Sequence, residues 1–144
     1  MGSSGGHLSQ LYALRPWWEK HHRRWVTFDK EDARSLLAGE TVAWAHHPTT
    51  RNIPNAFRNY SLARRLLGEY RPDVVVSTGA GVALPFFLEA RRRRSRTVYV
   101  EVFDRIDSAS LTGRLCAPFT DLALVQWEEQ LRFYPNGVVV GRLL

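Results

Sequence analysis

Short apolar runs that suit buried strands alternate along this chain with segments of helical periodicity. The clearest run is Val74–Ser77, three valines and a serine with no polar alternation, which is typical of a strand covered on both faces. Similar runs predict strands at Trp25–Phe28, Thr41–Ala45, Thr97–Val102, Leu122–Gln126 and Val138–Val140. The alternation predicts an α/β fold, Rossmann-like, with a mostly parallel sheet and helices on both faces. A length of 144 residues with 44% apolar composition suits one domain, spanning residues 1–144.

Helices are predicted between these runs from the spacing of apolar residues. Leu8, Leu11, Leu14 and Trp18 recur at helical spacing near the start, and further helices are expected at Asp29–Leu37, Leu84–Arg92 and Leu111–Phe119. A longer helix is expected to begin near Asn52 and Pro54 and to end before Gly68 and Pro72. Its expected apolar stripe consists of Ile53, Phe57, Tyr60, Ala63 and Leu67.

The beginning of the sequence has the form of a turn that follows a strand. The segment Gly2–Leu8 is glycine-rich and leads directly into the first helical stripe, yet only Met1 precedes it. The first strand of the sheet is therefore expected to be missing, which would leave the hydrogen-bonding edges of its neighbours open. Alternative interpretations of this segment are an ordinary glycine turn or a leader sequence.

Cysteine content and hydropathy predict a cytoplasmic protein. The single Cys116 excludes an internal disulfide, and no apolar run approaches the roughly 20 residues that span a bilayer. The paired histidines at 21–22 and 46–47 lack the ligand spacing of a zinc site, so no metal site is predicted.

A formal net charge of +6 favours an anionic partner: nucleic acid, an acidic membrane or a phosphorylated substrate. Indole rings and cations gather in one early segment. Because indoles prefer membrane interfaces and cations bind anionic headgroups, the segment predicts peripheral membrane contact. The predicted contact residues are Trp17, Trp18, Lys20, Arg23 and Arg24. The alternative is that they form a solvated helix end followed by a buried strand.

Three loops follow predicted strands, or the place where one should be, and are expected to share the carboxyl edge of the sheet. That edge is where open α/β sheets bind ligands. The first loop contains Gly5 and Gly6 at the start of a helix, where free backbone amides favour a phosphate, and a diphosphate would suit it. His7 follows at the same helix N-terminus, whose positive end disfavours the imidazolium and favours a neutral ring. His7 is therefore a candidate base or phosphate-positioning donor.

The other two loops supply further candidates. Residues 77–81 repeat the phosphate-binding pattern with Ser77, Thr78, Gly79 and Gly81 at the start of another helix. The third loop places acidic groups at and beyond a strand end, with Glu101 as a candidate general base and Asp104 and Arg105 as candidate acceptor-binding residues. The alternative for the third loop is a structural ion pair with Arg105.

An ordered series of motifs resembles a known family. The series consists of GSSGGHL at 2–8, STGAG at 77–81, VE at 100–101, SLTGRL at 110–115, VQW at 125–127, YP at 134–135 and GRLL at 141–144. Together they resemble the membrane-anchoring subunit of the UDP-N-acetylglucosamine transferase of asparagine-linked glycosylation, and its bacterial polysaccharide-biosynthesis relatives of the PssD/CpsF type.

The resemblance implies one half of a GT-B glycosyltransferase, similar to the acceptor-binding domain of MurG, without a cofactor. It implies a second, donor-binding subunit that holds the UDP-sugar, a polyprenyl-diphosphate-linked acceptor, and a place on the inner face of the membrane. The eukaryotic members carry an N-terminal membrane helix that is absent from this sequence, so attachment is expected to be peripheral. By analogy Gly5, Gly6 and His7 match the first glycine loop, Thr78, Gly79 and Gly81 the second, and Glu101 an acidic position facing the cleft.

Two other functions compete with this hypothesis. The chain could be a non-catalytic membrane anchor and activator, with every reactive group on the partner. It could also be an anion- or nucleic-acid-binding regulator. Nucleic acid is not predicted as a partner, because the aromatic residues cluster near helix and strand ends and not on an exposed sheet face.

Overall fold

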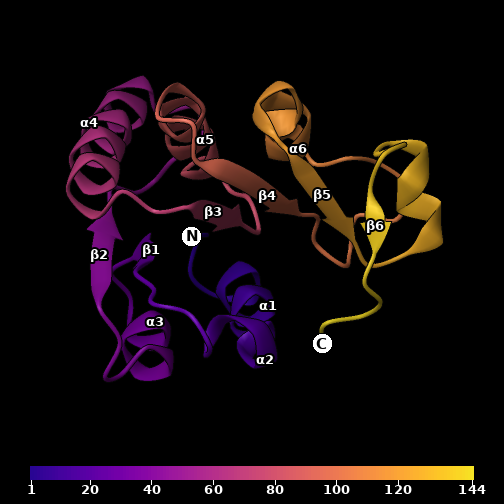
Figure 1. Cartoon of the computed structure of the whole chain (residues 1–144), viewed down its shortest axis with the longest axis horizontal. Coiled ribbons are helices and arrows are strands. Elements are labelled where there is room, and N and C mark those ends of the chain that lie inside the picture. Colours follow the sequence, from indigo (N-terminus) through magenta and orange to yellow (C-terminus); the bar gives the residue numbers. More distant parts are fainter.

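The computed structural model describes residues 1–144 and contains two parallel sheets (Figure 1). The first sheet pairs β1 (Trp25–Phe28) with β2 (Val42–Ala45). The second has the order β3-β4-β5-β6, formed by Val74–Ser77, Arg96–Val100, Leu122–Val125 and Val138–Val139. Every strand pair is parallel, so the loops after the strands gather at one edge. The predicted Rossmann-like arrangement is confirmed.

Helices lie on both sides of the sheets (Figure 1). One layer consists of α4 (Ile53–Tyr70), α5 (Ala83–Arg92) and α6 (Leu111–Cys116), and the other of α1 (Gly6–Ala13), α2 (Arg15–Trp18) and α3 (Glu31–Leu36). Two short 3-10 helices, η1 (Ala117–Phe119) and η2 (Glu128–Arg132), lie before and after β5. The early apolar stripe is divided between α1 and α2 because Pro16 lacks an N–H and occupies the first turn of α2. None of these helices combines the length and the apolar character needed to cross a bilayer.

Two apolar clusters hold the layers together. The larger one packs α4 and α5 against the strands and includes Phe86, Phe87 and Tyr99. The smaller one joins α1 and α2 to β1 and α3, with Trp18 and Trp25 in edge-to-face contact at a centroid distance of 5.3 Å. Burying each such large side chain stabilises the fold by about 1.5–3 kcal/mol.

The predicted apolar stripe of α4 is wrong at its N-terminal end. Asn52 caps the helix as expected, accepting from the Asn55 amide at 2.9 Å, but Ile53 and Phe57 are 71% and 72% exposed. The buried face carries asparagines instead. Asn59 is fully buried because its side chain binds both the amide and the carbonyl of His46, at 2.8 and 2.9 Å. The helix therefore buries hydrogen-bonded polar groups and leaves two large apolar side chains in solvent.

The expected gap in the sheet lies between β1 and β3. Only the first two residues of the chain occupy it: the Met1 nitrogen donates to the Val76 carbonyl at 2.7 Å, and the Gly2 amide donates to the Val26 carbonyl at 3.2 Å. The two sheets are consequently halves of one sheet, joined at this point by a single short segment.

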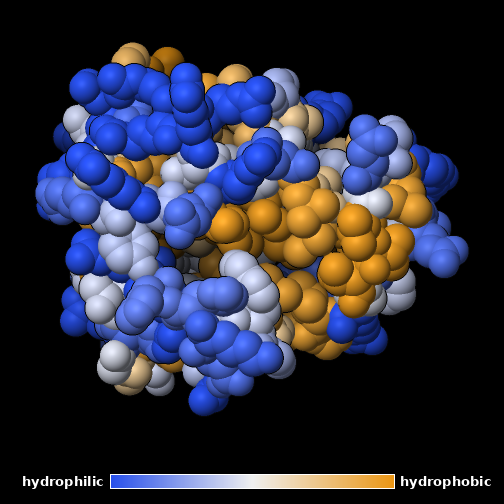
Figure 2. Space-filling model, in the orientation of Figure 1, coloured by the Kyte–Doolittle hydropathy of each residue, from blue (hydrophilic) through white to orange (hydrophobic).

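The second sheet is only partly covered on one face. Tyr99 of β4 packs against Phe87 of α5, so its neighbours Val98 and Val100 point to the opposite side. In register with them on that side are Leu122, Leu124 and Val138. Figure 2 shows a continuous apolar area over β4, β5, β6 and the C-terminal segment. Exposed large apolar side chains of these elements include Leu122 (37%), Val138 (49%), Val140 (41%) and Leu144 (50%).

Candidate functional site

His7 lies at the start of α1 and is fixed by the second glycine loop. Its Nδ1 is 2.7 Å from the Thr78 carbonyl oxygen. Because a carbonyl can only accept, Nδ1 carries the hydrogen of this bond, and in the neutral ring Nε2 keeps a free lone pair. The Thr78 hydroxyl in turn donates to the His7 carbonyl at 2.8 Å. The ring is therefore held in the tautomer that could accept a proton at Nε2.

The first two loops meet closely, as predicted. Gly79 has a φ of 104°, and a Cβ there would lie 2.7 Å from the Tyr99 hydroxyl and 3.5 Å from the His7 ring. A Cβ at Gly2 would lie 2.7 Å from the Thr78 hydroxyl. Both positions have room for glycine alone, which lets the two loops come together at the carboxyl edge of the sheet.

Backbone amides are open at both helix starts. Gly5 precedes α1 with a φ of 74°, and its amide is already bound to the Asp32 carboxylate at 2.7 Å. The next two amides, of Gly6 and His7, have no partner within the protein, and the same holds for that of the exposed Gly81, just before α5. Such amides, at the positive ends of helices, are a suitable environment for a phosphate.

The hydroxyls of the second loop do not face a ligand. Ser77 and Thr78 are fully buried. The Ser77 Oγ accepts from the Gly79 amide at 3.0 Å, while the Thr78 hydroxyl is bound to His7. Both side chains thus shape the loop, and only its backbone is open to an acceptor. Because both residues are fully buried, backbone included, a part in acceptor binding stays a prediction only through the shape that they give the loop.

Glu101 does not face the cleft as an open carboxylate, contrary to expectation. It is fully buried. Its oxygens accept from the Val102 amide, the Ser110 amide and the Ser110 hydroxyl, each at 3.0 Å, and these bonds compensate for its burial. The Tyr134 hydroxyl donates to it as well. Burial, followed by the bond to the Glu101 carboxylate, raises the pKa of the Tyr134 hydroxyl, which therefore stays protonated as the donor. The geometry favours a positioning role, and direct acid–base chemistry by Glu101 stays a prediction.

This buried carboxylate is linked to the first two loops. Ser110 Oγ is 2.9 Å from the Tyr99 hydroxyl, which lies directly beneath Gly79. Burial, followed by the nearby negative charge of Glu101, raises the pKa of Tyr99 and keeps it a neutral hydrogen-bonding group. Glu101, Ser110 and Tyr99 form a continuous support for the surface on which His7 rests.

Three buried glutamines brace the third loop. Gln10 of α1 accepts from the Phe103 amide at 3.1 Å and from the Gln126 side chain at 2.6 Å. Gln130 donates to the carbonyls of Val102 and Arg105, at 3.0 and 3.2 Å. These residues attach the loop to both α1 and η2. Asp104 and Arg105, at its tip, are exposed and make no ion pair with each other.

Two of the five predicted membrane-contact residues have internal partners in the structure, and the other three are exposed. Trp18 is only 7% exposed, and the prediction for it is wrong because its ring packs against Trp25 in the smaller core. The Arg23 guanidinium binds the Glu40 carboxylate at 2.6 Å and covers the Trp18 ring at 4.5 Å. The bond to Arg23 holds the pKa of Glu40 below its usual range, so Arg23 is part of an internal ion pair.

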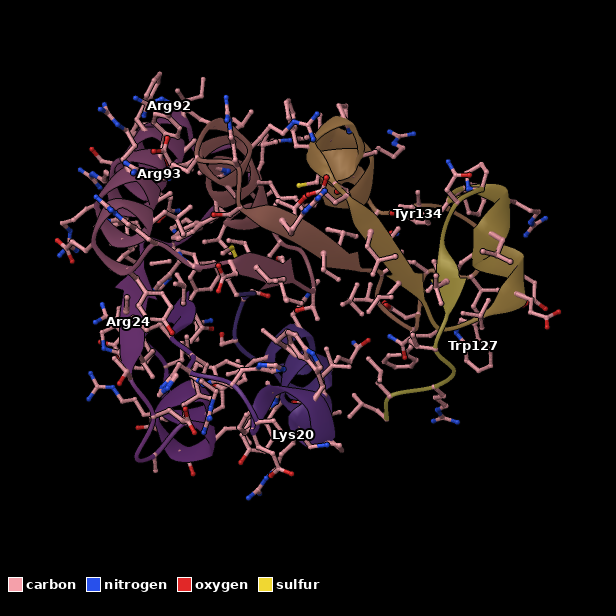
Figure 3. The ribbon with its side chains drawn as sticks, in the orientation of Figure 1. Lys20, Arg24, Arg92, Arg93, Trp127 and Tyr134 are labelled. Carbon is pink, nitrogen blue, oxygen red and sulfur yellow. The ribbon has the colours of Figure 1, made fainter.

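The remaining members, Trp17, Lys20 and Arg24, are exposed, and Arg24 packs over the Tyr70 ring at 4.9 Å. Figure 3 shows Lys20 and Arg24 beside α2 and the β1–β2 sheet. They precede β1 in the chain, so they lie near the amino edge of a parallel sheet, opposite the glycine loops. A membrane bound at this segment would not lie next to the candidate site.

Comparison with known proteins places these features in a family. Residues 48–143 match the family described as "Oligosaccharide biosynthesis protein Alg14 like". The chain belongs to the Alg14-like family. The UDP-N-acetylglucosamine transferase subunit ALG14 of Eremothecium gossypii is 39% identical over 78% of this chain and 51% of its own length. The mouse subunit of the same name is 30% identical over 100% of this chain and 81% of its own.

Solved structures share the fold of this Alg14-like chain. MurG of Acinetobacter baumannii matches with a TM-score of 0.72 and 16% identity, over 90% of this chain and 41% of MurG. A UDP-GlcNAc 2-epimerase from Methanocaldococcus jannaschii matches with a TM-score of 0.71 and 17% identity, over 98% of this chain and 44% of the epimerase. The chain thus spans about half of the Eremothecium relative and less than half of each structure. The predicted family and GT-B type of fold are confirmed.

The sequence did not predict a role for some residues of the site. Ser110 and Tyr134 lie in motifs that carried the family resemblance, yet no role was predicted for either, and Figure 3 shows Tyr134 on the segment after β5. Tyr99 was counted only as part of a strand. A tyrosine between two valines of a strand that ends just before a glutamate is the available signal, because a buried hydroxyl needs a partner.

Proposed function

We propose that this Alg14-like chain is the acceptor-side half of a UDP-sugar glycosyltransferase that acts on a polyprenyl-diphosphate-linked acceptor at the cytoplasmic membrane face. The observation that carries the proposal is the meeting of two helix starts, with open amides on both, around the His7 ring. A diphosphate has two anionic groups, and two neighbouring helix starts match that charge. The names of the transferase-subunit relatives support the reaction class.

In the proposed reaction the acceptor hydroxyl attacks the anomeric carbon of the sugar, and the bond to UDP breaks with inversion. The hydroxyl proton passes to the free Nε2 of His7, and UDP leaves with the bonding electrons. The amides of Gly6, His7 and Gly81 hold the acceptor diphosphate, and the exposed Arg105 adds positive charge from the third loop. Glu101 positions these loops from below.

The donor-binding partner is proposed to cover the open face of the second sheet. Parallel sheets are normally buried on both faces, and here Leu122, Val138 and Val140 are exposed in one apolar area (Figure 2). Contiguous apolar patches of this kind mark association surfaces. The UDP-sugar is then held mainly by the partner, because this chain corresponds to less than half of the MurG structure.

A membrane-contact surface is proposed at the carboxyl edge of the sheet, in place of the segment at residues 17–24. Ile53 and Phe57 begin α4 and Leu111 begins α6, all 65–72% exposed, and both helices start at that edge. The exposed Arg51, just before α4, and the exposed Arg58, on α4, flank the pair in sequence. Apolar side chains ringed by cations suit an anionic bilayer surface. This surface would bring the lipid diphosphate next to His7.

Diphosphate binding is tested by a pair of variants at Gly6. Proline is accepted at the first position of a helix but lacks the N–H, so Gly6→Pro removes one open amide, whereas Gly6→Ala keeps it. A Cβ at this position meets nothing within 4 Å. Losing one hydrogen bond to a charged group costs about 1.5–3 kcal/mol, so Gly6→Pro is expected to weaken binding to vesicles carrying undecaprenyl diphosphate about 10-fold or more relative to Gly6→Ala. Equal binding by both variants would remove the amide from the site.

Membrane contact is tested by exchanging exposed aromatic residues at the two edges. Phe57→Glu is expected to weaken binding to phosphatidylglycerol vesicles about 10-fold or more, because burying one such side chain contributes about 1.5–3 kcal/mol. Trp17→Glu, a matched change at the opposite edge, is expected to leave binding nearly unchanged. Flotation of both variants with the vesicles measures the difference. The reverse outcome would restore residues 17–24 as the membrane-contact segment.

A further inference from the structure

One carboxylate lies directly at the start of α1, next to the open amides of the proposed diphosphate site. The Asp32 Oδ2 accepts from the Gly5 amide at 2.7 Å, and the two following amides, of Gly6 and His7, have no partner within the protein. Asp32 comes from the first turn of α3, which packs beside α1 in the smaller apolar cluster. A negative charge therefore stands at the edge of a site that is proposed to bind an anion.

No cation of the protein neutralises this carboxylate, in contrast to the acidic residues around it. Asp29 binds the Arg34 guanidinium at 2.5 Å. Glu40 binds the Arg23 guanidinium at 2.6 Å. Asp32 is exposed and takes part in no ion pair, and its one hydrogen-bond partner is a neutral backbone amide. Its charge is thus uncompensated, and its second oxygen, Oδ1, is free to accept from a ligand.

An uncompensated carboxylate discriminates between two forms of a lipid diphosphate. A bare lipid diphosphate ends in a phosphate with a charge of about −1.5 to −2 at neutral pH. In the sugar-linked form this end is esterified, so its charge is lower and sugar hydroxyls follow it. An ionised carboxylate repels the bare phosphate and accepts hydrogen bonds from the hydroxyls. Repulsion of the wrong ligand, combined with attraction of the right one, is a common source of specificity.

We propose that Asp32 is a specificity-determining residue of the acceptor site, where it selects a diphosphate that carries a sugar over one that does not. The Gly5 amide holds one carboxylate oxygen in place, and the other oxygen accepts from a sugar hydroxyl. The amides of Gly6 and His7 bind the neighbouring phosphate. Glu101 cannot take this part, because its carboxylate is fully buried and its oxygens are occupied. The role of Asp32 rests on the proposed function, which places the lipid diphosphate at the start of α1.

The Asp32→Asn variant tests this role on two kinds of phosphatidylcholine vesicle, which carry either undecaprenyl diphosphate or undecaprenyl-diphosphate-linked N-acetylglucosamine. The asparagine oxygen can still accept from the Gly5 amide, so the variant removes the charge and keeps the bond. The preference for the sugar-linked lipid is measured as the ratio of the two dissociation constants. It is expected to fall about 10-fold, mainly because the bare diphosphate binds more tightly once the repulsion is removed.

The matched control is Glu31→Gln. Glu31 is the adjacent exposed carboxylate of α3, and it has no hydrogen-bond or ion-pair partner in the protein. Its replacement changes the net charge by the same amount and is expected to alter the preference by less than about 2-fold, because solvent and salt screen exposed charges that do not contact the ligand. Two results would overturn the proposal: an unchanged preference in Asp32→Asn, or an equal fall in Glu31→Gln, which would assign the effect to net charge alone.

The Gly6 variants separate the role of Asp32 from the proposed function. Weaker binding of the sugar-linked lipid by Gly6→Pro than by Gly6→Ala, together with an unchanged preference in Asp32→Asn, would contradict the role of Asp32 alone. Equal binding of that lipid by both Gly6 variants would contradict the diphosphate site itself.

Discussion

The His7→Ala variant is expected to lower the rate of sugar transfer by this chain and its donor-binding partner by about 10²- to 10⁴-fold, the usual contribution of a positioned general base. The reason is geometric: Nδ1 is committed to the Thr78 carbonyl, which leaves Nε2 to accept the acceptor proton. The measurement is the initial rate at saturating UDP-sugar and lipid acceptor. His22→Ala, an exposed histidine near the opposite edge, serves as the control and is expected to retain full activity.

The His7→Asn variant separates chemistry from positioning. Its side-chain amide can still donate to the Thr78 carbonyl but offers no base, so it is expected to be as inactive as His7→Ala while binding the acceptor normally. A transfer rate close to that of the unmodified chain in both variants would contradict the assignment. This chain would then be an anchor and activator, with the reactive groups on the partner.

The Glu101→Ala variant is expected to reduce the free energy of unfolding by about 3 kcal/mol or more. Its carboxylate accepts from the Ser110 amide and from two hydroxyls at a fully buried position, and each buried polar group left unpaired costs about 1–3 kcal/mol. Urea denaturation monitored by circular dichroism measures the loss. Glu129→Ala, at an exposed position in η2, is the control and is expected to change stability by less than about 0.5 kcal/mol.

A double-mutant cycle with Tyr134→Phe tests the same network. Because the two side chains share one hydrogen bond, the combined loss of stability is expected to be smaller than the sum of the single losses. Full stability of Glu101→Ala combined with loss of transfer at low temperature would instead support direct catalysis by Glu101. Additive losses would show that the two residues act independently.

Much of the fold could be predicted from local sequence because short apolar runs without polar alternation are typical of the strands of parallel sheets. A β-branched run such as Val74–Ser77 has few alternatives, and both this strand and Trp25–Phe28 have the predicted bounds. The placement of the three loops at one edge followed from parallel topology alone, and the contact between His7 and Thr78 confirms it for the first two.

The directions of side chains could not be predicted in the same way. Sequence placed Glu101 at the end of a strand but could not show that Ser110 and Tyr134 would enclose it, since both come from later segments. In α4 the apolar rule selected Ile53 and Phe57, whereas the helix buries Asn59 because the loop after β2 supplies partners for its amide. Tertiary hydrogen bonds decided both cases.

Within the predicted membrane segment, Trp18 and Arg23 differ from expectation for a related reason. Trp18 and Arg23 have the composition of an interfacial segment, yet Trp25 and Glu40 provide internal partners for both. Composition alone does not distinguish a tryptophan that meets lipid from one that packs on a neighbouring strand. The edge of the sheet on which a residue lies is the more reliable guide to its distance from the site.

The most direct test of the account is sugar transfer from UDP-N-acetylglucosamine to a polyprenyl-diphosphate acceptor, measured with this chain alone, with a donor-binding glycosyltransferase subunit from the same organism alone, and with both together. The account predicts product only when both are present. Equal product from the donor-binding subunit alone would contradict the claim that this chain supplies the acceptor half of the enzyme.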